Sequence, residues 1–259
     1  MDYLHKIEEN PCQDLYWNIP EQKQGAVGIV GGNSQSFRTP VSAAEIFAAK
    51  YPIKTVNLIL PDALRTTLPP FDGLIFLPST DSGSFADDKS LTEAINATDF
   101  SLMIGDLSKN SITAKAVRSA CQNSEKPLLI TRDSADLLAT EVTEKTLMNE
   151  KLIIFASMAQ LQKLFRAVYY PKVLLLSQSL VQVAEALHKF TLSYPISIIT
   201  FHSGQILVAK NGNVNVVPLE KSGYSPITIW NGELAAKIVA LNLYNPDNFL
   251  VTTTTALFA

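Results

Sequence analysis

Short apolar runs alternate with helical patterns along most of this chain, and this alternation limits the possible folds more than any other feature. The runs recur at intervals suited to a parallel sheet, and the segments between several of them carry apolar residues at helical spacing. Such alternation predicts an α/β domain with a mainly parallel central sheet. The predicted strands are residues 25–32, 55–60, 73–77, 100–104, 127–130 and 151–155, and the predicted helices are 41–50, 90–96, 111–121 and 158–168.

The last third of the chain has a different pattern. A helix at 179–191 is followed by three runs, 196–201, 205–209 and 213–217, which predict a β-meander with a tight turn at Asn211-Gly212. Residues 246–259 contain consecutive threonines that favour a strand, but Asn245-Pro246-Asp247 resembles a helix start, so a helix is expected. Residues 1–24 are predicted to be a short helix and an irregular lead-in. Without repeats or linkers, residues 1–259 are expected to form a single domain.

Composition excludes several classes of protein. With 259 residues, 47% of them hydrophobic, the chain can bury the core of one large domain. The net charge is −3 and the basic residues are dispersed, so we expect no nucleic-acid partner. Cys12 and Cys121 have no metal-type spacing, which predicts reduced thiols and no metal site. No run approaches the ~18 apolar residues of a membrane span, and a cytoplasmic protein without membrane contact is expected.

One stretch places a short polar turn directly before a strongly helical run. We expect Asn231 to be the N-cap of this helix and Glu233 to lie in its first turn. Backbone N–H groups at such a helix start can hold phosphate or an oxyanion, and an acidic side chain beside them can act as a base. An ordinary capped helix is the alternative interpretation of the same residues.

Three further stretches carry a resemblance to known proteins. Ile19-Pro-Glu-Gln-Lys-Gln-Gly-Ala-Val-Gly-Ile-Val-Gly-Gly-Asn33 is similar to a glycine-rich opening, Leu102-Met-Ile-Gly-Asp106 lies where a Gly-Pro-Gly-Leu-Gly loop is expected, and Leu128-Leu-Ile-Thr-Arg-Asp-Ser-Ala-Asp-Leu-Leu138 is similar to a strand that carries Asp-Ala-Asp-Ala-Leu-Asn. Their order resembles the ribokinase-like superfamily, and within it the nucleotide-dependent NAD(P)H-hydrate dehydratases. The resemblance implies a three-layer α/β/α sandwich with a mainly parallel central sheet and a late β-meander.

In function, the resemblance implies a carbon–oxygen lyase that uses ADP or ATP, with Mg²⁺ as an accompanying ion, to restore NADH or NADPH from its hydrate. Phosphorylation would turn a hydroxyl into a better leaving group. The family's Gly-Thr-Gly-Asp corresponds to Trp230-Asn231-Gly232-Glu233. The implied catalytic base is Glu233. The implied nucleotide or phosphate site is Asn231, Gly232, His202, Gly105 and Trp230, and the implied substrate site is Gly31, Gly32, Asn33, Asp133, Ser157 and Gln160.

The chain departs from the family at several of these positions. Ser157 replaces a histidine, Gln160 a glutamate, and His202 a lysine, while Asp106 places a carboxylate near the expected anion. Trp230 replaces a glycine and either obstructs phosphate or stacks on a ligand ring. Three functions therefore remain open: a divergent hydrate dehydratase, a non-catalytic relative used for nucleotide binding, assembly or regulation, and a small-molecule kinase. A homo-oligomer is also left open.

Overall fold

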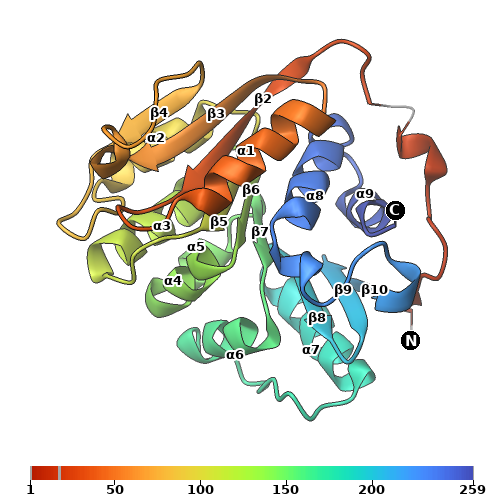
Figure 1. Cartoon of the computed structure of the whole chain (residues 1–259). Coiled ribbons are helices and arrows are strands. Elements are labelled where there is room, and N and C mark those ends of the chain that lie inside the picture. The colour runs from red at the N-terminus through yellow and green to blue at the C-terminus, as the bar shows by residue number, and fades with distance from the viewer. Residues whose placement is uncertain (1, 17–18, 259) are drawn as a thin grey trace.

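A single ten-stranded sheet forms the middle layer of the molecule, as seen in the computed structural model, which describes residues 2–16 and 19–258 (Figure 1). The strand order is β1-β10-β9-β8-β7-β6-β5-β2-β3-β4, and neighbours from β8 to β4 run parallel. The strands are β1 (Leu4–Lys6), β2 (Gln24–Gly31), β3 (Ile53–Pro61), β4 (Leu74–Leu77), β5 (Phe100–Gly105), β6 (Leu128–Thr131), β7 (Leu152–Phe155), β8 (Ser197–His202), β9 (Gln205–Lys210) and β10 (Asn213–Pro218).

Helices cover both faces of the sheet. On one face α1 and α8 lie side by side with α9 next to α8, and the remaining helices pack on the other face (Figure 1). Side chains alternate between the two cores along each central strand: Leu102 and Ile104 face α8, whereas Met103 faces the opposite layer. The helices are α1 (Arg38–Lys50), α2 (Asp88–Asn96), α3 (Ser111–Asn123), α4 (Asp133–Glu141), α5 (Glu144–Leu147), α6 (Met158–Ala167), α7 (Leu180–Ser193), α8 (Glu233–Tyr244) and α9 (Phe249–Ala256).

This architecture confirms the predicted parallel sheet and late meander. Strands β8, β9 and β10 pair antiparallel, and Asn211 and Gly212 connect the last two with φ angles of 50° and 77°. Both residues therefore adopt the left-handed conformation of a tight hairpin turn. No helix in the described residues has the length and apolar character needed to cross a membrane.

The helix predicted at the start of the chain was wrong, although most of the lead-in is irregular as expected. Leu4–Lys6 form strand β1, which pairs parallel with β10, with Leu4 opposite Val214. The only helical element described before β2 is a short 3₁₀ turn, Gln13–Tyr16. A three-residue strand at a sheet edge is stabilised by its partner strand, so its own sequence carries little signal. Helices α4 and α5, between β6 and β7, were also not predicted.

The start of α8 differs from the prediction as well. Gly232, with φ 97°, occupies the N-cap position instead of Asn231. Asn231 ends the 3₁₀ turn Thr228–Trp230, and the left-handed residue that follows favours glycine. The Asn231 side chain still accepts a hydrogen bond from the Glu233 N–H at 2.9 Å. Glu233 lies in the first turn as expected.

The final helix is confirmed, and two of its four buried threonines accept hydrogen bonds from asparagine side chains. Asn242 Nδ2 donates to Thr253 Oγ1 at 3.1 Å, and Asn215 Nδ2 donates to Thr254 Oγ1 at 2.9 Å. Buried amides and hydroxyls need such partners. The consecutive threonines therefore join α9 to α8 and to β10.

Candidate functional site

The predicted site residues follow the carboxyl ends of parallel strands. Gly31 ends β2, Gly105 ends β5, Thr131 ends β6 and Phe155 ends β7. These strands are neighbours in the sheet, so the loops after them lie at the same edge. In open α/β sheets ligands bind at this edge. The 3₁₀ turn Thr228–Trp230 and the start of α8 complete it.

Two glycines allow these loops to approach each other closely. A Cβ on Gly31 would lie 2.5 Å from the carbonyl oxygen of Gly105, and the Gly32 N–H donates to the same carbonyl at 3.0 Å. Gly105 itself has a φ of 104°, and a Cβ there would lie 3.2 Å from the Cβ of Arg132. The glycines that the resemblance assigned to ligand binding thus allow close packing between the ends of β2, β5 and β6.

Asp106 directs its carboxylate inward from the loop after β5. The residue is 7% exposed, and its Oδ2 accepts a hydrogen bond from the Thr39 N–H, in the first turn of α1, at 2.9 Å. The Asn33 side chain donates to the Asp106 carbonyl at 2.7 Å. A carboxylate at a helix start satisfies a free N–H group and interacts favourably with the positive helix end. The chain therefore supplies its own anion at the position where α1 could otherwise bind one.

Arg132 connects Asp106 to the turn before α8. Its Nη2 lies 3.6 Å from Asp106 Oδ1, and its Nη1 donates to the Trp230 carbonyl at 3.2 Å. Arg132 has a φ of 57°, and its Nε is buried without a hydrogen-bond partner. A strained backbone and an unsatisfied donor persist only where surrounding contacts hold them. We refer to Asp106, Arg132 and Trp230 as the edge network.

The stretch from Trp230 to Glu233 is held by side-chain contacts of its own. The Trp230 ring packs against the Phe155 ring with centroids 5.0 Å apart and the planes tilted by 37°. The Glu233 carboxylate forms an ion pair with Lys50, the last residue of α1, and both side chains remain partly exposed. A Cβ on Gly232 would lie 2.6 Å from Ile104 Cδ1. Gly232 is therefore required for packing against β5 in addition to its turn conformation.

Ser157 and Gln160 form the capping box of α6. The Gln160 N–H donates to Ser157 Oγ, and the Ser157 N–H donates to Gln160 Oε1 at 2.9 Å. The remaining side-chain nitrogen of Gln160 donates to the Arg132 carbonyl at 2.8 Å and to Asp136 Oδ2 at 2.9 Å. An amide can donate these bonds, whereas an ionised glutamate cannot. The substitution of glutamate by Gln160 therefore extends the edge network towards α4.

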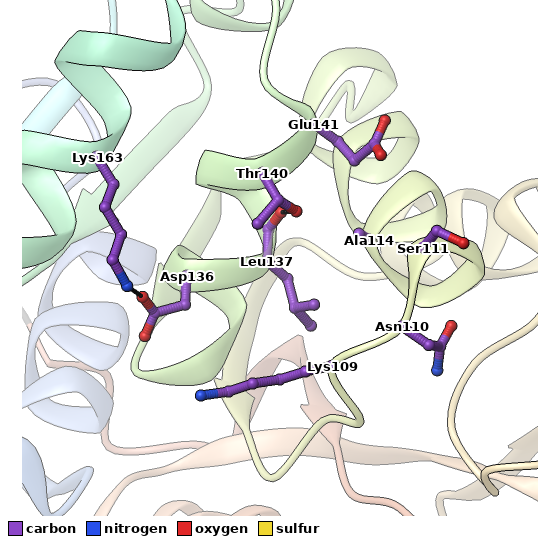
Figure 2. A pocket seen from close by; sticks show the side chains of 9 residues that line it. All are labelled: Lys109, Asn110, Ser111, Ala114, Asp136, Leu137, Thr140, Glu141 and Lys163. Atoms are coloured by element: carbon purple, nitrogen blue, oxygen red, sulfur yellow. Dashed lines mark hydrogen bonds and ion pairs between the residues drawn. The ribbon is translucent and has the colours of Figure 1, made fainter.

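A cavity of about 430 Å³ lies beside Asp136, the carboxylate to which Gln160 donates. Figure 2 shows the Asp136 carboxylate between the ammonium groups of Lys163 and Lys109, and Lys163 Nζ lies 2.6 Å from Asp136 Oδ1. Burial by itself raises the pKa of Asp136, but hydrogen bonds from Lys163 and Gln160 and the charges of both lysines hold the pKa below its ordinary value. The cavity is lined by Lys109, Asn110, Ser111, Ala114, Asp136, Leu137, Thr140, Glu141 and Lys163.

The charges around this cavity balance. Lys109 and Lys163 are opposed by Asp136 and Glu141, so a highly charged anion gains little net attraction there. The same walls offer both donors and acceptors. This geometry suits a neutral or zwitterionic small molecule better than a polyphosphate.

His202 and Asp133 are the remaining predicted site residues. His202 is 5% exposed, and its Nε2 lies 2.8 Å from the Gln178 carbonyl oxygen, so its ring joins the end of β8 to the loop before α7. Asp133 is the first residue of α4, and its backbone nitrogen faces Gly105. Within residues 2–16 and 19–258, no three His, Cys, Asp or Glu side chains cluster in a way that could hold a metal ion.

Arg132 was not among the site residues predicted from the sequence. Arg132 precedes the aligned Asp133 and belongs to no motif of the family, and its partner Trp230 is 98 positions further along the chain. Nothing local in the sequence signals such a contact. Of the predicted site residues, Gln160 and Trp230 are hydrogen-bonded to Arg132, and Gly105 lies beside it. Asn33 bonds Asp106, and Gly31 and Gly32 lie against Gly105.

Comparisons with known proteins show a shared fold. No protein-family model matches the chain, and no curated protein matches it. A ribokinase-like superfamily protein from Enterococcus faecalis V583 aligns with a TM-score of 0.62 at 13% identity, over 100% of this chain and 86% of that one. The ADP/ATP-dependent NAD(P)H-hydrate dehydratase of Bacillus subtilis, co-crystallised with ATP and Mg²⁺ and soaked with CoA, aligns with a TM-score of 0.62 at 11% identity, over 100% and 87% of the two chains.

A hypothetical protein, SMU.573 from Streptococcus mutans, aligns with a TM-score of 0.61 at 16% identity and covers 94% of this chain and 86% of that one. These alignments confirm the predicted ribokinase-like three-layer α/β/α fold. At such low identities they establish the fold and leave the activity to be argued from the site.

Proposed function

We propose that this ribokinase-fold protein is a non-catalytic assembly protein in which the edge network occupies the position of the phosphate chemistry. The observation that carries the proposal is the Asp106 carboxylate, which bonds the Thr39 N–H and lies beside Arg132. A fixed carboxylate at this position repels phosphate and occupies a donor that an anion would use. Arg132, the cation nearest to it, is engaged with Asp106 and the Trp230 carbonyl.

The implied catalytic base and two residues of the implied binding sites are also engaged in structural contacts. Glu233 pairs with Lys50, and His202 faces the Gln178 carbonyl. Gln160 uses its amide to bond Arg132 and Asp136. A general base must reach the reacting proton in a suitable protonation state, and none of these contacts points to that role. Several of the implied site residues thus serve structural contacts, which agrees with a scaffold retained after catalysis was lost.

An exposed apolar segment supports assembly as the retained role. Between α6 and α7, Tyr169 is 93% exposed, Val173 55%, Leu175 46% and Leu176 66%. Four exposed apolar side chains within eight residues of the chain favour an interaction site there. We propose a second copy of the chain as the partner. Light scattering of the wild-type protein is expected to give a dimer or larger oligomer, and the double variant Val173→Glu with Leu176→Glu is expected to give a monomer.

A monomeric wild-type protein at micromolar concentration would contradict the assembly role. Leu192→Glu is a matched control, because Leu192 is 63% exposed but lies on α7, outside this segment. The control variant is expected to keep the oligomeric state of the wild type. Retained circular dichroism would show that each variant is folded.

The second candidate is a divergent NAD(P)H-hydrate dehydratase that uses ADP or ATP with Mg²⁺, or a small-molecule kinase. Two features favour it. Glu233 keeps a partly exposed carboxylate in the first turn of α8, and Gly232 precedes it in a left-handed conformation. The similar Bacillus subtilis protein is an ADP/ATP-dependent dehydratase by name.

A thermal-shift titration separates the two candidates. ADP, ATP, AMP, NADH and NADPH are each added with and without Mg²⁺ to the wild-type protein. Ligand at 100 times its Kd would stabilise the folded state by about 2.7 kcal/mol and raise the Tm. If the protein is non-catalytic, we expect no change in its Tm at millimolar ligand. A shift with ADP or ATP would overturn it, and loss of NAD(P)H-hydrate turnover in Glu233→Gln would then support catalysis.

A further inference from the structure

A groove lies at the opposite edge of the sheet, where the parallel strands begin. It consists of two adjoining cavities of about 470 Å³ and about 200 Å³. Strand starts form one wall, and the end of α8 with the start of α9 forms the other. The two cavities share Phe100, Pro127, Lys151, Asn242 and Pro246. None of these residues belongs to the edge network, so the groove is independent of the function proposed above.

Lys210, the last residue of β9, projects into the smaller cavity. Its Nζ lies 5.0 Å from the centre of the Phe249 ring, and the described residues include no ion-pair partner for it. Burial lowers the pKa of Lys210, with Glu150 opposing and Lys151 adding to the decrease. A half-buried ammonium over an aromatic ring gains from an anion that replaces its lost hydration.

A second polar group beneath the cavity lacks a partner. Ser197 is fully buried, and its Oγ has no hydrogen-bond partner. On one side, Ser197 of β8 is paired with Ile153 of β7, and Ile153 lines the cavity. On the other side Ile198 is paired with Ala209, so Ser197 and Lys210 are neighbours across β8 and β9. Unsatisfied buried hydroxyls are uncommon and call for an explanation such as a water or ligand nearby.

The charge and the walls of the smaller cavity define the ligand. Lys151 pairs with Glu150 at 3.0 Å, which leaves Lys210 as the unbalanced charge among the lining residues. The other lining residues include two phenylalanines and two prolines: Phe100, Phe249, Pro127 and Pro246. An anion with one charge and a flat apolar body matches both features.

We propose that this cavity binds a small aromatic monocarboxylate, with the carboxylate on Lys210 and the ring between Phe249 and the prolines. The probe is benzoate, and the control ligand is benzamide, which has the same shape and no charge. Ligand-detected NMR and thermal shift are measured on the full chain. Benzoate is expected to bind at least about tenfold more tightly than benzamide, as a charge-assisted hydrogen bond would provide.

Three variants locate the site. Lys210→Met is expected to weaken benzoate binding at least about tenfold, and Lys210→Arg is expected to retain it because the charge is kept. Lys126→Met is the matched control, since Lys126 is exposed and lines the larger cavity but not the smaller one. That control is expected to bind benzoate like the wild type. Equal binding of benzoate and benzamide, no binding of either, or unchanged benzoate binding in Lys210→Met would each overturn the proposal.

Discussion

Arg132 lies 3.6 Å from the Asp106 carboxylate, and this pair joins the end of β6 to the end of β5. The Asp106 side chain is 8% exposed and the Arg132 side chain 32%. Removal of one partner from a largely buried pair leaves the other charge uncompensated. The pair is therefore the part of the candidate site where a single substitution is expected to have the largest electrostatic effect on stability.

Asp106→Ala should destabilise the protein by about 2–4 kcal/mol, because it leaves Arg132 unpaired and removes the acceptor of the Thr39 N–H. Arg132→Met in the same background should cost less than in the wild type, since no carboxylate is then left alone. Urea unfolding measures each variant. Glu8→Gln, which removes an exposed ion pair with Lys6, should leave the urea midpoint unchanged. Strict additivity of the Asp106 and Arg132 variants would show that the two residues do not interact.

Gly31→Ala should destabilise by roughly 2 kcal/mol or more, because the new Cβ would lie 2.5 Å from the Gly105 carbonyl oxygen. The comparison variant is Gly204→Ala. Gly204 has a φ of 75°, and a Cβ there would have no atom within 4 Å, so only backbone strain of about 1 kcal/mol is expected. Thermal unfolding compares the two. A smaller effect at Gly31 than at Gly204 would mean that the ends of β2 and β5 can separate at little cost.

Glu185 should titrate far below an ordinary glutamate. Hydrogen bonds from Lys172 and Lys189 lower its pKa from 4.5 to about 2. A carboxylate whose pKa is lowered by folding stabilises the folded state at pH values above the pKa of the unfolded chain. This contribution is lost as the pH falls through the pKa of the folded state. The stability that Glu185 contributes is therefore lost as the pH falls from about 4.5 to about 2. NMR titration of the side-chain carboxyl tests this, and a midpoint near 4.5 would show that solvent screens both lysines.

The two cysteines should differ sharply in reactivity. Cys121 is fully buried on α3, and burial raises the pKa of its thiol, whereas Cys12 is partly exposed. The thiolate is the reactive form, so Ellman's reagent should modify Cys12 quickly and Cys121 only on unfolding. Cys12→Ser should abolish the fast phase and leave the slow one. A fast reaction that survives in Cys12→Ser would mean that α3 opens readily.

Much of the architecture could be predicted because its signals are local. The helix at α3 and the strands β5 and β7 follow from apolar spacing within each segment, and the tight turn follows from Asn211-Gly212. Strand β1 could not be predicted, since its three residues are stabilised by β10, far along the chain. The N-cap of α8 was misplaced for a similar reason. Gly232 packs on Ile104, and that contact exists only in the folded sheet.

The sequence by itself determined the alternation of strands and helices, the meander and the presence of a carboxylate at Glu233, because periodicity and residue type are properties of short segments. Only the tertiary structure decided what the polar residues contact. Asp106 bonds the start of α1, Arg132 reaches Trp230 across 98 positions, and Glu233 pairs with Lys50. Such pairs depend on how distant segments pack against one sheet, and neighbouring residues in the sequence do not encode that geometry.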